Sequence, residues 1–359
     1  MKNKFRCILI ALVLLSPYVV PAVADQNPAM NDPEKFAWQA LFIPINKSAG
    51  AGQNAVWETW ASDEDTFPAN PSATQPPAWP ATAPQNKKLR PSLQLRLLDA
   101  QRAREAQDEV RIFGANVVQP PIAPSGDSEE VRRNRAAFDF IVQNKLYYRQ
   151  GIVAAFNAGK PIVFPIEAIE VKAKWKPITE AQKPLYHWNT DASGKLFGLV
   201  ALHVISKDVP NWVWATFEHV DNPERCKVLG CKDSFGLTPD GKVSPALMAL
   251  FKANGLGPEW QSYRLDGVQL DFTSSTGVPT LLGNSIIEDG FVSTSSCITC
   301  HAKSTASATG THLPVFNPAG QSDNGVPPPS WFYSGTIPPK PVFLQLDFVW
   351  GFLAARPAH

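Results

Sequence analysis

The stretch Leu196–Val220, LFGLVALHVISKDVPNWVWATFEHV, decides the predicted fold. It contains two largely apolar runs, Leu196–Ser206 and Trp212–Val220, and each is typical of a β-strand. The five residues between them, Lys207–Asn211, include an aspartate, a proline and an asparagine, which suit a hairpin loop. We therefore expect two neighbouring antiparallel strands in the middle of the protein.

Two further segments have the pattern of strands. Ile162–Trp175 alternates between apolar and polar residues, as a half-buried strand does, and Tyr263–Phe272 is a shorter candidate. Together with the hairpin, they predict an α+β fold in which a central antiparallel sheet is flanked by helices.

We expect the clearest helix between about Ser128 and Ala158. Asp127 can cap its N-terminus, with Glu130 as the acid of a capping box. Apolar residues then recur at helical spacing, and Gly159 follows the expected end. Gly151 can divide this stretch into two helices.

The composition indicates long irregular connections between these elements. The chain has 34 prolines, whose fixed φ angle favours turns and extended loops, and 11 tryptophans, which supply large buried surfaces. Residues 67–91 read as an extended loop, and residues 303–340 are rich in Gly, Ser, Thr and Pro. We expect a loop-rich globular protein.

The first 24 residues have the layout of a secretory signal peptide. Met1–Arg6 is basic, Cys7–Val20 is apolar, and Ala22-Val23-Ala24 offers small residues for cleavage after Ala24. The apolar run is shorter than the roughly 20 residues that a spanning helix needs. We therefore expect a periplasmic protein that has no stable membrane span after cleavage.

Loss of the signal peptide removes Lys2, Lys4 and Arg6 and changes the formal net charge from +1 to −2. A nearly neutral chain with mixed charges gives no electrostatic reason to bind nucleic acid or anionic lipid. We therefore expect neither as a partner.

Four cysteines remain after cleavage. In an oxidising compartment, Cys226 and Cys231 are expected to form a local disulfide that closes the loop Cys-Lys-Val-Leu-Gly-Cys. Closing so short a loop removes little chain entropy, so the bond would mainly fix local shape.

The other two cysteines belong to the motif Cys297-Ile298-Thr299-Cys300-His301. Cysteines three residues apart lie one turn apart on a helix, where each thiol can add to one vinyl group of a haem. The adjacent histidine can bind the iron from the same helix. The motif predicts one covalently attached haem c, with His301 as the proximal ligand.

Three other interpretations of this motif remain. A thioredoxin-like dithiol would normally follow a strand and open a long helix, but small polar residues precede Cys297. An all-cysteine zinc site could also use Cys226 and Cys231, although their spacing is loose for a zinc half-site. A disulfide between Cys297 and Cys300 would be strained.

The five-residue motif resembles the haem-attachment site of c-type cytochromes. The resemblance covers the motif and a few tens of residues around it. It implies that Cys297 and Cys300 form thioethers and that His301 binds the iron. Trp212–His219 is also similar to segments of large uncharacterised bacterial cytochromes, without indicating an activity.

The second axial ligand departs from the usual pattern of small cytochromes, because no methionine follows His301. Met248, in the expected helix Pro245–Ala253, and His312 are the candidates for this position. His203 and His219, on predicted strands, are less favoured, and an open or water-bound iron is a further alternative.

Glu218 and His219 could serve as an acid–base pair beside the iron. Neighbouring residues on a strand point to opposite faces, however, so only one of them can face a given pocket. We therefore do not expect a catalytic pair at this position.

These observations divide the 359 residues into three parts. Residues 1–24 form the signal peptide, and residues 25–273 form an α+β domain of unknown role. Residues 274–359 form a small, mostly helical haem-binding segment that packs back on the core through Val342–Ala354.

Three functional hypotheses fit these predictions. The first is a periplasmic cytochrome that transfers single electrons to or from a redox partner protein. The second is a haem enzyme or a small-molecule or gas sensor with an open distal site. The third is a ligand-binding protein in which the haem is an accessory. The sequence does not decide whether the chain is an enzyme, and it leaves the oligomeric state open.

Overall fold

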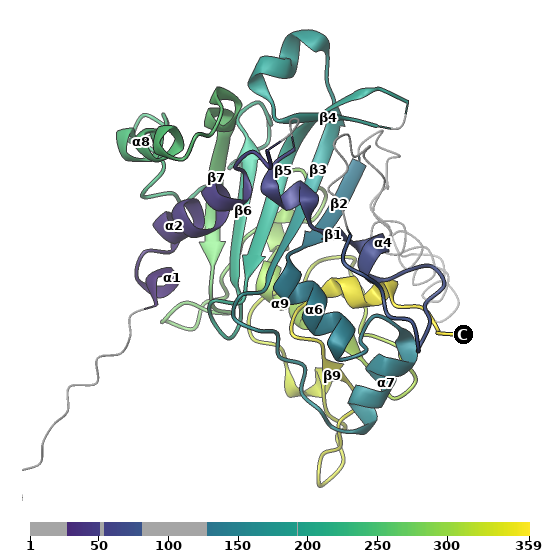
Figure 1. Ribbon diagram of the computed structural model, residues 1–359. Coiled ribbons are helices and arrows are strands. Elements are labelled where there is room, and N and C mark those ends of the chain that lie inside the picture. Colours follow the sequence, from purple (N-terminus) through teal and green to yellow (C-terminus); the bar gives the residue numbers. More distant parts are fainter. Residues whose placement is uncertain (1–26, 51–53, 81–127, 192) are drawn as a thin grey trace, which may run out of the picture.

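The computed structural model describes residues 27–50, 54–80, 128–191 and 193–359. They form an α+β fold around a seven-stranded sheet, and every strand pair in this sheet is antiparallel (Figure 1). The strand order is β1-β2-β3-β5-β6-β7, with β4 also paired to β5. The predicted fold class is therefore confirmed.

The strands of the large sheet are β1 (Ala61–Ser62), β2 (Ser128–Arg133), β3 (Ile169–Pro177), β4 (Trp188–Thr190), β5 (Leu196–Ser206), β6 (Val213–His219) and β7 (Tyr263–Gln269). A separate two-stranded sheet pairs β8 (Thr305–Ala306) with β9 (Leu344–Gln345).

The α-helices are short: α1 (Pro28–Asn31), α2 (Pro33–Phe36), α3 (Ile43–Ile45), α4 (Asp63–Thr66), α6 (Arg135–Gln143), α7 (Arg149–Asn157), α8 (Pro245–Ala253) and α9 (Cys297–Ala302). A π-helix, η1 (Ala37–Phe42), joins α2 to α3. The 3-10 helices are η2 (Val56–Thr59), η3 (Glu180–Leu185), η4 (Pro258–Ser262), η5 (Val292–Thr294), η6 (Pro329–Trp331) and η7 (Trp350–Ala354). Among the described residues, no helix has the length and hydropathy needed to cross a bilayer.

The predicted hairpin forms the middle of the sheet. Its register pairs His203 with Thr216 and Ile205 with Trp214. Alternate residues of β5 and β6 therefore point to opposite sides of the sheet. We call the side that carries Val204 the first face and the side that carries His203 the second face.

The first face is apolar and is covered by the N-terminal helices and α8; α1, α2 and α8 lie beside β7 and β6 at the left of Figure 1. Trp38 of η1 packs edge-on against Phe42 and Phe217, with ring centroids about 5 Å apart (4.9 and 5.0 Å). Leu247 and Phe251 of α8 join the same buried cluster. The predicted helix Pro245–Ala253 is thus confirmed, on the first face.

The second face is covered by α6, α7, α9 and the C-terminal residues. Ile205 and Trp214 of the sheet contribute to this buried cluster, and so does Phe352 of η7. The segment Val342–Ala354 therefore returns to the core, as expected.

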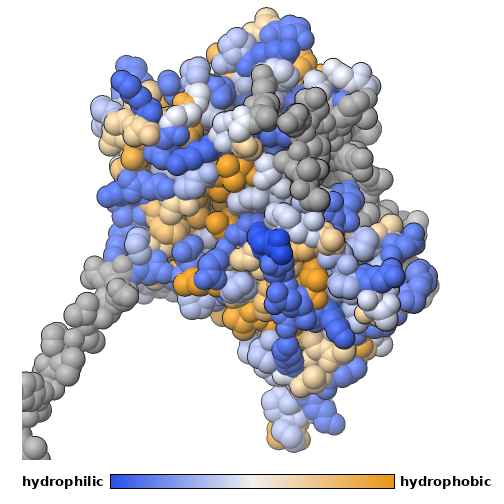
Figure 2. Space-filling view, viewed as in Figure 1, coloured by the Kyte–Doolittle hydropathy of each residue, from blue (hydrophilic) through white to orange (hydrophobic). Residues whose placement is uncertain are grey.

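On the outer surface, Figure 2 shows apolar residues towards the middle of the view and hydrophilic residues around them.

The predicted helix Ser128–Ala158 is partly wrong. Ser128–Arg133 is the strand β2, paired along its length with β3, and Asn134 caps α6 by accepting a hydrogen bond from the Ala137 N–H. The predicted capping box is not formed, because Glu130 lies on β2 and pairs with Arg132 in a buried ion pair. The break between α6 and α7 precedes Gly151, which lies inside α7.

Other predicted boundaries also change. The strand expected over Ile162–Trp175 begins only at Ile169, because Pro161 and Pro165 lack the N–H groups that a central strand needs. Strand β7 ends at Gln269, before the expected Phe272. Residues 274–359, expected to be mostly helical, are mainly turns and loops, with only the short helices α9, η5, η6 and η7 among them. The signal peptide and residues 81–91 of the expected loop lie outside the described residues.

A buried ion network joins the N-terminal segment to the sheet. Arg133 of β2 contacts Asp63 of α4 at 2.5 Å and Glu170 of β3 at 3.3 Å, and its side chain is fully buried. It also donates a hydrogen bond to the Thr66 hydroxyl at 2.7 Å. One guanidinium thus compensates two buried carboxyl groups from different elements.

Replacement of Arg133 by methionine should strongly destabilise the protein. The change keeps an apolar stem but leaves Asp63 and Glu170 buried without their cation, a loss of about 3–5 kcal/mol in the free energy of unfolding. The matched control is Arg135→Met, two residues away, whose exposed pair with Asp139 is worth about 0.5 kcal/mol. Denaturant unfolding measures both; equal effects of the two variants would contradict this role for Arg133.

Candidate functional site

Helix α9 carries the Cys-x-x-Cys-His motif and is tied to the edge strand β7. The Ile298 N–H donates to the Gln269 side-chain oxygen at 3.0 Å, and the Gln269 amide donates to the Ser296 hydroxyl at 2.9 Å. On the other side, the Thr299 hydroxyl donates to the Gly325 carbonyl at 2.7 Å. These contacts fix the short helix against the second face of the sheet.

The two motif cysteines are free thiols one turn apart on α9. Cys297 is buried, with its Sγ 3.4 Å from the Leu282 carbonyl oxygen, whereas Cys300 is half-buried. Burial raises the pKa of the Cys297 thiol well above its ordinary value, and the nearby Glu288 carboxylate raises it further. No disulfide joins Cys297 and Cys300, so that alternative is not supported.

The other two cysteines of the described residues form the predicted disulfide, Cys226–Cys231. It lies in the loop after β6, not on α9. The all-cysteine zinc site is therefore not formed. The thioredoxin-like alternative also lacks its long helix, because α9 has only six residues.

His301 follows Cys300 on α9 and has a fixed ring orientation. Its Nδ1 lies 2.7 Å from the Phe348 carbonyl oxygen, so Nδ1 carries the proton and donates it to that carbonyl. The Nε2 lone pair is then available for a metal. Burial lowers the pKa of His301 to about 3, which keeps the imidazole neutral at ordinary pH.

Aromatic rings surround this imidazole. The Trp214 ring lies 4.6 Å from the His301 ring, and the Trp350 ring lies 6.2 Å from it, measured between centroids. Trp214 comes from the second face of the sheet and Trp350 from η7. The free cysteine pair, the anchored Nδ1–H and the aromatic surroundings fit a covalently attached haem with His301 as one axial ligand.

Polar residues of the sheet face this helix. Lys172 of β3, His203 of β5 and Thr216 of β6 lie directly opposite one another across three adjacent strands. Glu288, from the loop before α9, lies 3.4 Å from His203 Nε2. Although burial would raise the pKa of Glu288, the charges of His203 and Lys172 lower it below its ordinary value.

The loop between β7 and α9 covers the rest of this polar row. Asn284 donates to the Thr216 hydroxyl at 3.0 Å, and the Ser285 hydroxyl donates to the Glu218 carboxylate at 2.7 Å. The sequence alone does not single out Lys172 or Glu288. Strand alternation places Lys172 on the same face as His203 only once the β3–β5 register is known, and no local signal points to Glu288.

The two favoured candidates for the second axial ligand lie elsewhere. Met248 is on α8, which packs on the first face, and the residue is 36% exposed. His312 lies after β8, where its Nδ1 is 3.2 Å from the Leu313 carbonyl oxygen. Burial lowers the pKa of His312, and the charge of Arg149 lowers it further. His203, less favoured from the sequence, is on the face that α9 covers.

Glu218 and His219 have separate surroundings, as expected for neighbours on a strand. The His219 ring stacks on Tyr186 with centroids 3.7 Å apart and hydrogen-bonds to the Leu185 carbonyl at 2.9 Å. Glu218 accepts hydrogen bonds from Asn222 and Ser285 on the other side of the sheet. The two residues do not form a catalytic pair.

Comparisons with protein-family models, with curated proteins and with solved structures found no significant match.

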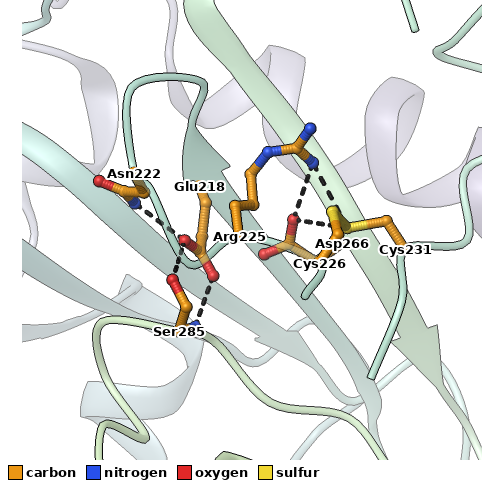
Figure 3. The surroundings of a disulfide bond; sticks show 7 residues. All are labelled: Glu218, Asn222, Arg225, Cys226, Cys231, Asp266 and Ser285. Atoms are coloured by element: carbon orange, nitrogen blue, oxygen red, sulfur yellow. Dashed lines mark hydrogen bonds and ion pairs between the residues drawn. A yellow bond between two sulfur atoms is a disulfide. The ribbon is translucent and has the colours of Figure 1, made fainter. Parts of the chain in front are cut away.

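The disulfide has a buried carboxyl group beside it (Figure 3). Asp266 Oδ1 lies 3.2 Å from Cys231 Sγ and 3.3 Å from an Arg225 guanidinium nitrogen. Burial raises the pKa of Asp266 well above its ordinary value, and the nearby Glu218 carboxylate raises it further. Asp266 therefore retains a proton at pH values where an exposed aspartate would be ionised.

This carboxyl group should make stability depend on pH. Asp266 binds its proton more tightly in the folded chain than in the unfolded chain, so the free energy of unfolding falls as the pH rises above about 4. Asp266→Asn imitates the protonated acid and should make this decline with rising pH less steep than in wild type. The exposed Asp240→Asn serves as the control. Denaturant unfolding at each pH measures the effect, and parallel curves for wild type and Asp266→Asn would contradict it.

Proposed function

We propose that this protein is an exported monohaem c-type cytochrome that transfers single electrons. One haem is attached through Cys297 and Cys300, and His301 is its proximal axial ligand. The bound haem supplies a one-electron couple between ferric and ferrous iron.

The observation that carries the proposal is the arrangement of the motif on α9. The thiols of Cys297 and Cys300 remain unpaired in a chain whose Cys226 and Cys231 are joined, and His301 follows on the same short helix. The Phe348 carbonyl holds the imidazole in the tautomer whose Nε2 can bind iron. A helix with only a structural role would not need two unpaired thiols, an adjacent histidine and a fixed imidazole tautomer.

The residues around α9 have separate tasks in this proposal. The two thiols would hold the haem through thioether bonds to its vinyl groups. The bond between His301 and the Phe348 carbonyl fixes the ring and makes the imidazole a better electron donor. Trp214 and Trp350 pack around the imidazole and restrict the access of water to it.

Export and an electron-transfer partner are part of the same proposal. The signal-peptide pattern at residues 1–24 and the Cys226–Cys231 disulfide are both typical of a protein outside the cytoplasm. We infer that the α+β domain holds the haem segment rigidly and contributes to the surface on which a redox partner protein docks.

Replacement of both motif cysteines by alanine should abolish covalent haem. In Cys297→Ala/Cys300→Ala, haem staining that survives denaturing electrophoresis should disappear, because both thioether donors are lost. The matched control, Cys226→Ser/Cys231→Ser, also removes two cysteines but should retain the stain. Stain that persists in the first variant, or no stain in the wild-type protein matured in the periplasm, would overturn the proposal.

A further inference from the structure

We infer that His203 of β5 would be the second protein ligand of the haem iron, in addition to His301. This inference rests on the proposed function, and it identifies a ligand that the short motif does not contain. With two histidine ligands, the iron would have no coordination position open to another molecule.

The position of His203 is fixed by strands on both sides. It is paired with Lys172 of β3 and with Thr216 of β6. Trp214 lies two residues along β6 from Thr216, so it is a diagonal neighbour of His203 on the second face. The Trp214 ring contacts the His301 ring at 4.6 Å, which places His203 and His301 around the same tryptophan.

The imidazole of His203 is buried but incompletely bonded. The residue is 9% exposed, and its Nε2 makes no hydrogen bond within the part of the chain that the structure describes. This nitrogen lies 3.4 Å from Glu288 Oε2, an ion-pair contact that is longer than a good hydrogen bond. Buried polar atoms normally have a closer partner than this, so a nitrogen held only by the long contact with Glu288 is available to bind iron.

The other polar groups of this layer are engaged. The Lys172 ammonium pairs with a Glu129 carboxylate oxygen at 3.1 Å. The Glu288 carboxylate accepts a hydrogen bond from the Asn284 N–H at 2.6 Å. A buried imidazole nitrogen is also a better iron ligand than a carboxylate or a charged ammonium. His203 is therefore the residue of this layer best suited to bind iron.

Ligation by two histidines has functional consequences. It gives a lower reduction potential than a histidine–methionine pair, and it leaves no coordination position for a gas or substrate. The assignment therefore favours an electron carrier over the enzyme or sensor hypothesis.

The test is the absorption spectrum of the purified holoprotein, oxidised and reduced, with and without carbon monoxide. Wild type should be six-coordinate and low-spin and should not bind carbon monoxide readily. His203→Ala should keep its denaturation-resistant haem stain but become high-spin and bind carbon monoxide at once. Free imidazole should restore the low-spin spectrum of this variant.

Two further variants keep the test decisive. His203→Met should remain low-spin with a higher reduction potential than wild type, and it provides the readout if His203→Ala does not fold. His312→Ala is the matched control and should leave the spectrum unchanged.

Three results would overturn the inference while leaving haem attachment intact. They are a high-spin wild-type protein, an unchanged low-spin spectrum in His203→Ala, and loss of the low-spin spectrum in His312→Ala. Absence of covalent haem from wild type would instead contradict the proposed function itself.

Discussion

The alternation of side chains along β5 and β6 is the constraint on which the rest of the structure depends. Each strand is buried along almost its whole length, so both faces of the sheet must be covered. One face carries Val204, Ala215 and Phe217, and apolar helices suffice to cover it. The other face carries His203, Thr216 and Glu218, and any segment that covers it must supply hydrogen-bond and charge partners.

The segment from Leu282 to α9 meets that requirement. Asn284 and Ser285 bond to Thr216 and Glu218, and Glu288 approaches His203. The loop that supplies these polar partners is followed directly by α9, so it also places the Cys-x-x-Cys-His helix against the sheet. The C-terminal residues cover His301 and bind its imidazole through the Phe348 carbonyl. The candidate site therefore arises from three separate parts of the chain that meet on one face of the sheet. Its polar residues both stabilise the packing of α9 and lie around His203, the histidine of the sheet that is proposed to bind the haem iron.

The sequence predicted the parts of this structure that depend on local pattern. The hairpin, the Pro245–Ala253 helix and the Cys226–Cys231 disulfide all follow from residues close together in the chain. The strand β2 was mistaken for the start of a helix because its charged residues are buried only through partners distant in sequence, such as Asp63 and Glu170 for Arg133. For the same reason, the motif on α9 could be recognised from the sequence, whereas the residues that pack around it could not be predicted. Nothing local distinguishes His203 from His312, since only the strand register places His203 on the face that α9 covers.

The central claim is that Cys297 and Cys300 carry a haem, and mass spectrometry tests it most directly. The protein is expressed with its own leader, purified from the periplasm, denatured and digested. The account predicts that the peptide containing both cysteines and His301 is heavier than its sequence by one haem, and that the Cys226–Cys231 peptide is oxidised. A Cys297–Cys300 peptide of unmodified mass, with two free thiols or a disulfide between them, would contradict the account.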